Sequence, residues 1–186
     1  MPTPDPDWPS WASEPVELVA PDPTWLARGR RAGQSLDEAL GALLVCPVEH
    51  VGSTAIPGLP AKPILDLLAE VSDLAVAEQV AGLLAPQGWH YVPPELDGRP
   101  YERFFVQVLD GHRVAHLHLL RAGSPQRTDL VRFRDLLRGN RHLAADYAAL
   151  KAGLAAAHRD DRERYSAAKH GFVTDVLRGQ HSRGAG

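Results

Sequence analysis

The 186-residue sequence predicts an α+β domain: a small mixed β-sheet with flanking helices, followed by a C-terminal helical bundle. Three observations support this prediction. Short apolar runs with the two-residue alternation of strands are concentrated between residues 45 and 120. From residue 123 onward, apolar residues recur at helical spacing instead. Apolar residues make up 44% of the chain, which is enough to form a core in a protein of this length.

The first half of the domain is expected to contain two helices and two strands. Asp22 is a suitable helix N-cap, and Pro23 suits the first helical position. Prolines and glycines interrupt any regular structure between the two strands. The expected elements are a helix over 23–44, a strand over 45–51, a loop over 52–63, a strand over 64–71 and a helix that starts at the Asp73 cap and ends before Gly88.

The second half begins with three strands and ends in helices. Asp110-Gly111-His112 is a good hairpin turn between two alternating runs, so these runs are predicted to pair. The expected elements are strands over 89–92, 102–109 and 113–120, a polar loop over 93–100, a helix starting at Pro125, a helix over 143–158 and a last helix capped by Asp160 or Asp161.

We expect a single domain over residues 16–178, with a sheet-containing core over 16–122 and a helical part over 123–178. The residues on either side have the composition of tails. Residues 1–15 are rich in proline and aspartate and are predicted to be disordered, and residues 179–186 are predicted to be flexible.

Composition excludes several classes of protein. The net charge is −3 and the pI is near 6.3, so the basic footprint of a general nucleic-acid binder is missing. Cys46 is the single cysteine, so neither an internal disulfide nor a cysteine-based zinc site is expected. The sequence shows no signal-like start and no apolar window of membrane-spanning length. We therefore expect a cytoplasmic protein without membrane partners.

Asp66 is the first candidate for chemistry. Alternation places it on one face of the strand over 64–71, and the opposite face is entirely apolar. A buried carboxylate is costly without a partner, so Asp66 is expected either to face a cleft and meet a cation or to form a salt bridge with Lys62 or an arginine.

The loop just before this strand is the second candidate. Gly52 and Ser53 offer open backbone N–H groups and a hydroxyl, which suit a phosphate. His50 and Thr54 flank the pair, and Lys62 follows it, so we predict that all five residues take part in phosphate or nucleotide binding. The alternatives are a tight turn at Gly52, a helix cap at Ser53 or Thr54, and a surface position for Lys62.

His116 and His118 share one face of the strand over 113–120, about 6.6 Å apart along it. Two imidazoles and the Asp66 carboxylate would suit a divalent metal such as Mg²⁺, Mn²⁺ or Zn²⁺, with nitrogen donors favouring Mn²⁺ or Zn²⁺. A half-exposed polar face is the alternative. Lys169 lies four residues after Tyr165 on one helical face and is either a further phosphate ligand or a surface residue.

A Gly-Ser pair followed by an aspartate on a strand resembles the nucleotidyltransferase superfamily. That resemblance implies a second carboxylate two residues after the first, but position 68 is a leucine. Glu70 lies on the same face but about 13 Å from Asp66, too far to share a metal. A site holding two metals therefore lacks one of its acids.

More closely, the chain is similar to the GrpB family of nucleotidyltransferase-like proteins. The similarity runs in order from residue 16 to 177, and the matching stretches are 16–19, 22–25, 49–59 (EHVGSTAIPGL), 62–66 (KPILD), 103–105, 116–119 (HLHL), 133–138, 147–151 and 165–169. The resemblance implies a nucleotidyltransferase-like fold with activity mostly unassigned. In some bacteria a domain of this family is fused to dephospho-coenzyme A kinase, which implies a partner in coenzyme A metabolism or a role in assisting folding.

Three functional hypotheses follow. In the first, the protein binds a nucleotide or other phosphorylated small molecule and carries out metal-dependent nucleotidyl or phosphoryl transfer, with Asp66, His116 and His118 as catalytic and metal-binding residues. In the second, the site is degenerate and the protein is a non-catalytic nucleotide- or coenzyme A-linked binding or chaperone-like module. In the third, His50, His116 and His118 support metal-dependent hydrolysis.

Overall fold

The computed structural model describes residues 11, 14–159 and 161–179. The two predicted tails therefore lie largely outside the described residues. Of the first fifteen residues, Trp11 and Glu14 contact the hairpin at residues 112 and 113: the Trp11 carbonyl accepts a hydrogen bond from Arg113 Nε, and Glu14 Oε1 lies 2.9 Å from His112 Nδ1.

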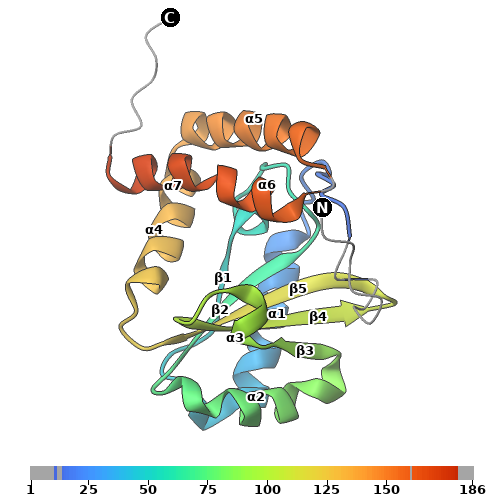
Figure 1. Ribbon diagram of the computed structural model, residues 1–186. Helices are drawn as coiled ribbons and strands as arrows, with labels where there is room; N and C mark the ends of the chain where they lie inside the picture. Colours follow the sequence, from blue (N-terminus) through green and yellow to red (C-terminus); the bar gives the residue numbers. More distant parts are fainter. Residues whose placement is uncertain (1–10, 12–13, 160, 180–186) are drawn as a thin grey trace, which may run out of the picture.

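A five-stranded mixed sheet forms the centre of the domain, in the order β1-β2-β5-β4-β3 (Figure 1). Strands β2 and β5 pair in parallel, and the other neighbours are antiparallel. The α+β architecture with a small mixed sheet is thereby confirmed. The strands are β1 (Glu49–Val51), β2 (Leu65–Val71), β3 (Trp89–Val92), β4 (Glu102–Leu109) and β5 (His112–Arg121).

Four of these strands lie where the sequence predicts them, to within one residue at each end. The strand expected over 45–51 is wrong in its first half, since β1 begins only at Glu49. The Val48 amide is held by the side chain of Asp37 instead of by a neighbouring strand. At the predicted hairpin, Asp110 and Gly111 both have a positive φ, which a tight two-residue turn requires.

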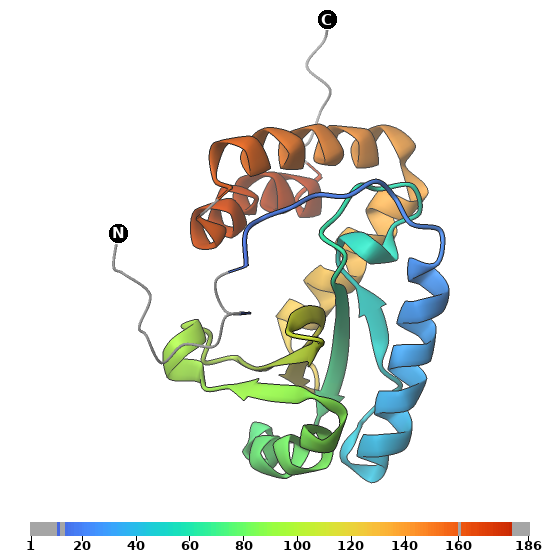
Figure 2. The same cartoon turned by 90° about the vertical axis from the view of Figure 1, so that its right-hand side faces the viewer.

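Two helices cover one face of the sheet. Helix α1 (Trp25–Leu40) and helix α2 (Ala77–Leu84) pack on the apolar side of β2 and β5, and Figure 2 shows α1 running alongside β1 and β2. The alternation predicted for the two strands is confirmed, since the core on this face contains Leu65, Leu67, Ala69 and Val71 of β2 and Ala115, Leu117 and Leu119 of β5.

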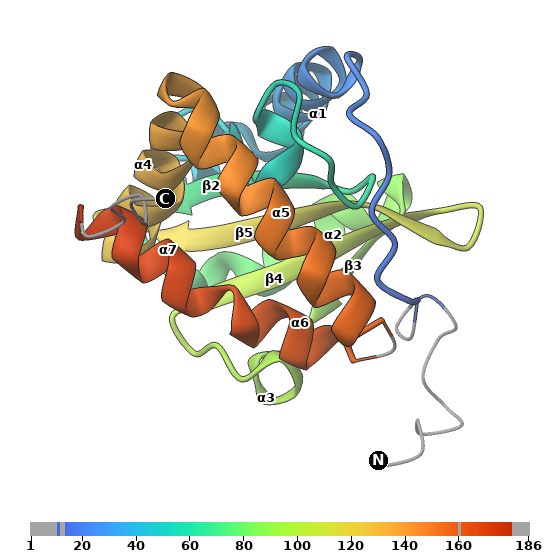
Figure 3. The same cartoon turned by 90° about the horizontal axis from the view of Figure 1, so that it is seen from above.

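The remaining helices lie over the opposite face, and Figure 3 shows α5, α6 and α7 crossing above the strands. The described helices here are α3 (Pro94–Asp97), α4 (Pro125–Gly139), α5 (Arg141–Ala157), α6 (Arg162–Ala168) and α7 (His170–Leu177). The last two were expected as one helix, but a turn at Lys169 separates them. Short 3₁₀ helices occur at Gly41–Leu43, Ser53–Ala55, Leu74–Val76 and Ala85–Gln87.

Helix α4 anchors the helical part to the sheet. Its residues Leu130 and Val131 pack on Val51, Leu68 and Leu120, which lie on the sheet face opposite α1. A separate apolar cluster around Tyr147 joins α4, α5 and α7. The helices therefore cover only part of this face and leave the rest open. Across the described stretches of the chain, no helix combines the length and apolarity needed to span a bilayer.

Candidate active-site cleft

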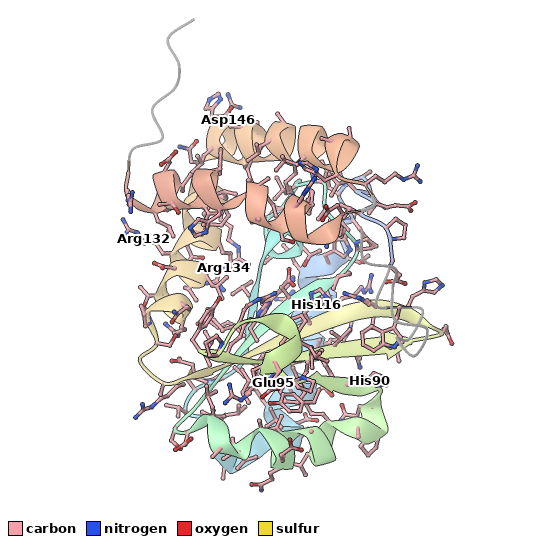
Figure 4. The ribbon with its side chains drawn as sticks, in the orientation of Figure 1. His90, Glu95, His116, Arg132, Arg134 and Asp146 are labelled. Atoms are coloured by element: carbon pink, nitrogen blue, oxygen red, sulfur yellow. The ribbon has the colours of Figure 1, made fainter. Side chains whose placement is uncertain are left out.

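A cleft of about 850 Å³ lies between the open part of the sheet and the C-terminal helices. Strands β2, β4 and β5 line one side, the Gly52–Ser53 loop lines one end, and residues of α4 to α7 line the other side. Figure 4 shows His116 between the sheet and these helices. Gly52, Ser53, Lys62, Asp66, His116, His118 and Lys169, all expected at the site, line this cleft.

Asp66, His116 and His118 converge in the cleft. Parallel pairing sets Asp66 opposite His116, so the two side chains lie on the same face of adjacent strands. His116 Nδ1 lies 3.0 Å from Asp66 Oδ1, and His118 Nε2 lies 3.8 Å from the same oxygen. The ring of Phe104, on the neighbouring strand β4, packs against both imidazoles and limits how they can turn.

Glu102 completes the group, and the sequence interpretation missed it. His118 Nδ1 donates a hydrogen bond of 3.1 Å to Glu102 Oε2, and Glu102 also pairs with Arg99. Glu102 is only 3% exposed. Strand alternation was the available signal, since Glu102 lies two residues before Phe104 on the same face of β4.

The two histidines hold different charges because their surroundings differ. Burial on its own lowers the pKa of His118, but hydrogen bonds to Asp66 and Glu102 outweigh it and raise this pKa to about 9. Burial dominates at His116 and lowers its pKa. Burial also opposes ionisation of Asp66, yet hydrogen bonds from both histidines hold its pKa well below the usual range. Burial is likewise outweighed at Glu102, whose pKa is lowered by its hydrogen bond to His118 and by the nearby Arg99. At neutral pH the group therefore contains an imidazolium (His118), a neutral imidazole (His116) and two carboxylates (Asp66 and Glu102).

One ring nitrogen of the neutral His116, Nε2, has no hydrogen-bond partner among the described residues. With its Nδ1–H directed at Asp66, its Nε2 carries the lone pair. This Nε2 is buried and makes no hydrogen bond to the described residues. A buried acceptor without a partner is uncommon in folded proteins. Because this nitrogen is buried, a ligand in the cleft can give it a hydrogen bond or a proton only after the surrounding side chains shift.

The close approach of Asp66 requires a glycine at position 52. Its φ of 71° lies in the left-handed region, and a Cβ at this residue would lie 2.2 Å from Asp66 Oδ2. The loop and the carboxylate are therefore in direct contact. The tight turn considered as the alternative at Gly52 is present, and phosphate binding by Gly52 stays a prediction.

All three lysines of the chain line the cleft, although the sequence contains 20 lysines and arginines in total. Lys62 lies before β2, Lys151 on α5, and Lys169 between α6 and α7. The Nζ atoms of Lys62 and Lys169 lie 5.6 and 4.3 Å from the centre of the Tyr165 ring. The expected site contained only two of these lysines.

Lys151 was missed because it follows a run of alanines on a helix with no obvious polar face. It is 1% exposed, and its Nζ donates hydrogen bonds to Ser53 Oγ at 3.0 Å and to the Pro60 carbonyl. Burial, together with the nearby charges of Lys169 and Lys62, lowers the pKa of Lys151 to about 7. Its spacing of four residues from Tyr147, on the buried stripe of the helix, was the usable signal.

His50 and Thr54 do not reach the cleft. His50 pairs with Leu67 across β1 and β2, so it lies on the α1 face of the sheet, where its ring contacts Gly29. Its Nε2 lies 2.9 Å from Thr54 Oγ1, which in turn donates to the Ile64 carbonyl. Burial lowers the pKa of His50 to about 4, so it is neutral. His50 and Thr54 therefore hold the Gly52–Ser53 loop from the α1 side of the sheet.

Glu49 of β1 and Glu70 of β2 are engaged in ion pairs. Glu49 accepts hydrogen bonds from Arg127 and Arg134 of α4, and Glu70 pairs with Arg127. Glu70 also accepts from the Gly123 amide. Leu68, where a second carboxylate would stand, is buried under α4. No second acid therefore joins Asp66 from this strand.

The donor types of Asp66, His116 and His118 suit Mn²⁺ or Zn²⁺. In this structure Asp66 Oδ1 is instead hydrogen-bonded directly to His116, 3.0 Å from its Nδ1. Within the described ranges, no group of three or more His, Cys, Asp and Glu side chains is arranged to hold a metal ion. As placed, these residues form a hydrogen-bonded cluster, and we assign no chemical step to a metal. The metal site stays a prediction.

The fold and the cleft define an α+β protein with a cation-lined cavity on one face of its sheet. The chain belongs to the GrpB family, since the family model described as GrpB protein matches residues 15–179. The crystal structure of the conserved protein GrpB from Enterococcus faecalis is similar, with a TM-score of 0.77 and 27% identity over 88% of this chain and 96% of that one.

Two curated relatives are longer than the matched region. The UPF0157 protein YqkA of Bacillus subtilis is 31% identical over 85% of this chain, and a dephospho-CoA kinase of Mycobacterium leprae is 28% identical over 88%. The chain spans 45% and 46% of their lengths. A structure of a cytoplasmic RNA terminal U-transferase superposes with a TM-score of 0.48 and 16% identity over 86% of this chain and 49% of its own.

Proposed function

We propose that the cleft binds a phosphorylated small molecule, with its phosphate groups between Ser53 and the three lysines. The observation that carries this proposal is the placement of every lysine of the chain in one cavity. An ammonium group is a compact point charge that binds phosphate oxygens. Three of them around one loop therefore favour an anion with more than one negative charge.

Lys151 and Ser53 supply the fixed part of this phosphate site. The hydrogen bond from Lys151 Nζ orients the Ser53 hydroxyl, which is also hydrogen-bonded to Tyr147. On ligand binding, the Ser53 hydroxyl would turn to donate its proton to a phosphate oxygen. Lys62 and Lys169 both lie against the Tyr165 ring and complete the positive end of the site. Their aromatic contact limits the motion of both ammonium groups.

Inorganic tripolyphosphate is a direct probe of this site, because it carries the charge without any other recognition group. We expect isothermal titration calorimetry to detect binding to the wild type and a loss of about tenfold or more in Lys62→Met and in Lys169→Met. Arg31→Met is the matched control, since Arg31 is exposed on α1, which covers the opposite face of the sheet. Equal affinity of all four proteins would disprove the proposal.

Phosphoryl or nucleotidyl transfer is the second candidate, favoured by the convergence of Asp66 with two histidines. His116 Nε2 would accept the proton of an attacking hydroxyl, as a general base. The His118 imidazolium and the lysines would stabilise charge on the transferred group. Phosphorus NMR of nucleoside triphosphates with candidate acceptors, with and without Mg²⁺ or Mn²⁺, tests it: turnover that Asp66→Asn abolishes supports transfer. If no turnover is found under any condition, the non-catalytic binding module is the hypothesis that remains.

A coenzyme A link is also a proposal. The Mycobacterium leprae relative named dephospho-CoA kinase contains a region similar to this chain, so dephospho-coenzyme A belongs among the ligands to be titrated. A partner enzyme of the coenzyme A pathway follows from the same similarity. Co-purification of this chain with a separately expressed dephospho-coenzyme A kinase tests that partner.

A further inference from the structure

The phosphate site occupies only one end of the cleft. The other end is formed by α4 and α7, which pack against each other. They contribute half-buried apolar side chains to the cavity: Leu130, Phe133, Val173 and Leu177. A phosphate group gains nothing from contact with these side chains, because apolar surface binds apolar or aromatic groups.

Aromatic residues lie on the sheet side of the same cavity. Tyr101, just before β4, lines the cleft and is 45% exposed. Phe104 lies on the cleft face of β4, and the Arg99 guanidinium lies 5.3 Å from its ring centre. A large exposed aromatic at the edge of a cavity is suited to stacking on a planar ligand group.

Polar side chains on α4 and α7 distinguish this wall from a lipid-binding groove. Gln126 and Asp129 on the first turns of α4, and Thr174 on α7, also line the cavity. They offer an amide, a carboxylate and a hydroxyl beside the apolar surface. Gln126 Oε1 already accepts a hydrogen bond from Ser124 Oγ, so Gln126 offers its amide N–H₂ group to a ligand. A hydrocarbon tail has no groups that pair with an amide, a carboxylate and a hydroxyl, whereas the edge of a nucleobase presents donors and acceptors that do.

The size of the cavity also points beyond a small phosphorylated metabolite. At about 850 Å³ it lies in the upper part of the range for pockets that take drug-sized ligands. A phosphate or a phosphosugar would fill only the lysine end and leave the α4–α7 wall exposed to water.

We infer that the ligand is a nucleotide, whose base lies between Tyr101 and the α4–α7 wall while its phosphates lie at Ser53 and the lysines. This inference rests on the proposed function, because the phosphate site fixes one end of the ligand. It adds the chemical class of the other end and names Tyr101 as the residue that selects it.

Calorimetric titration of ATP, GTP, UTP, CTP, ribose 5-phosphate and tripolyphosphate, in the same buffer, tests the inference. We expect at least one nucleoside triphosphate to bind about tenfold or more tightly than tripolyphosphate. Tyr101→Ala should weaken that nucleotide by about tenfold, the usual loss when a base loses its stacking partner, and leave tripolyphosphate unchanged. Tyr101→Phe should restore nucleotide affinity, because it keeps the ring.

A second variant, Leu177→Ser, probes the opposite wall and should weaken the nucleotide selectively as well. Thermal melting of each variant checks that it is folded. Nucleotides that bind no more tightly than tripolyphosphate, or that ignore Tyr101→Ala, would overturn the inference while the phosphate site stands. Failure of tripolyphosphate and every nucleotide to bind would overturn the phosphate site itself and this inference with it.

Discussion

Lys151 Nζ, on helix α5, donates a hydrogen bond of 3.0 Å to Ser53 Oγ, 98 residues earlier in the chain. This contact joins the helical part of the protein to the loop at the end of the sheet. Its acceptors, the Ser53 hydroxyl and the Pro60 carbonyl, are both neutral. The positive charge of Lys151 is therefore poorly compensated, and an anion in the cleft would supply what these acceptors do not.

The lowered pKa of Lys151 makes stability depend on pH. The folded chain has a Lys151 pKa of about 7 against 10.5 for the ordinary value, so the unfolded chain binds more protons between these limits. The free energy of unfolding contributed by this group therefore rises with pH across that window, by up to about 1.4 kcal/mol per pH unit. Urea denaturation at pH 7, 8.5 and 9.5 should show this rise as the difference between wild type and Lys151→Met. Arg31→Met should track the wild type.

The same group links anion binding to proton uptake. A bound phosphate raises the pKa of Lys151, so binding takes up a proton when the pH lies above about 7. Tripolyphosphate affinity should then fall as the pH rises from 7 to 8.5, more steeply for the wild type than for Lys151→Met. Titrations in buffers of different ionisation enthalpy measure the uptake directly. Identical proton uptake in both proteins would contradict this role for Lys151.

Gly52 and Gly58 form a natural pair of test and control. Both have a positive φ, of 71° and 75°, but an added Cβ collides with Asp66 only at Gly52 and meets open space at Gly58. Gly52→Ala should lower the free energy of unfolding by about 1–3 kcal/mol more than Gly58→Ala does, since local strain of this kind has that cost. Thermal and urea denaturation measure it. Tripolyphosphate binding should weaken only in Gly52→Ala, and equal effects of the two changes would refute the contact.

His118 should remain protonated at neutral pH. Its pKa of about 9 lies above the ordinary 6.5, so its stabilising contribution is complete below pH 6.5 and is lost as the pH rises through 9. Glu102→Gln removes one of its two carboxylate partners and should lower the pKa by about one to three pH units. Imidazole nitrogen NMR titration measures both proteins. Glu38→Gln, at an exposed position of α1, should leave the His118 titration unchanged.

The sequence predicted the sheet and half of the site because strand alternation is a local rule. It assigned Asp66, His116 and His118 to open faces, and the structure places them together. Their meeting depends on the parallel register of β2 with β5, which no local pattern contains. His50 shows the weakness of local reasoning, since a shift of one residue along a strand moves a side chain to the opposite face.

Lys151 and Glu102 were harder to predict for a physical reason. Both are charged residues that the fold buries, and a sequence pattern ordinarily assigns such residues to the surface. Their burial becomes intelligible only with their partners: Ser53 for Lys151, and His118 for Glu102. Those partners come from distant segments or from a neighbouring strand, so the tertiary structure had to be known first.

The hydrogen bond between Asp66 and His116 spans 50 residues, and two of the three lysines come later still. During synthesis, a nascent chain that has reached only β4 has neither imidazole to pair with Asp66, and it also lacks β5, the strand that joins β2 to β4. Ligand affinity should arise last, after α6 and the Lys169 turn have docked. If the cleft binds phosphate groups as proposed, ribosome-bound chains of increasing length should retain tripolyphosphate only once Lys169 has been synthesised and has left the ribosome.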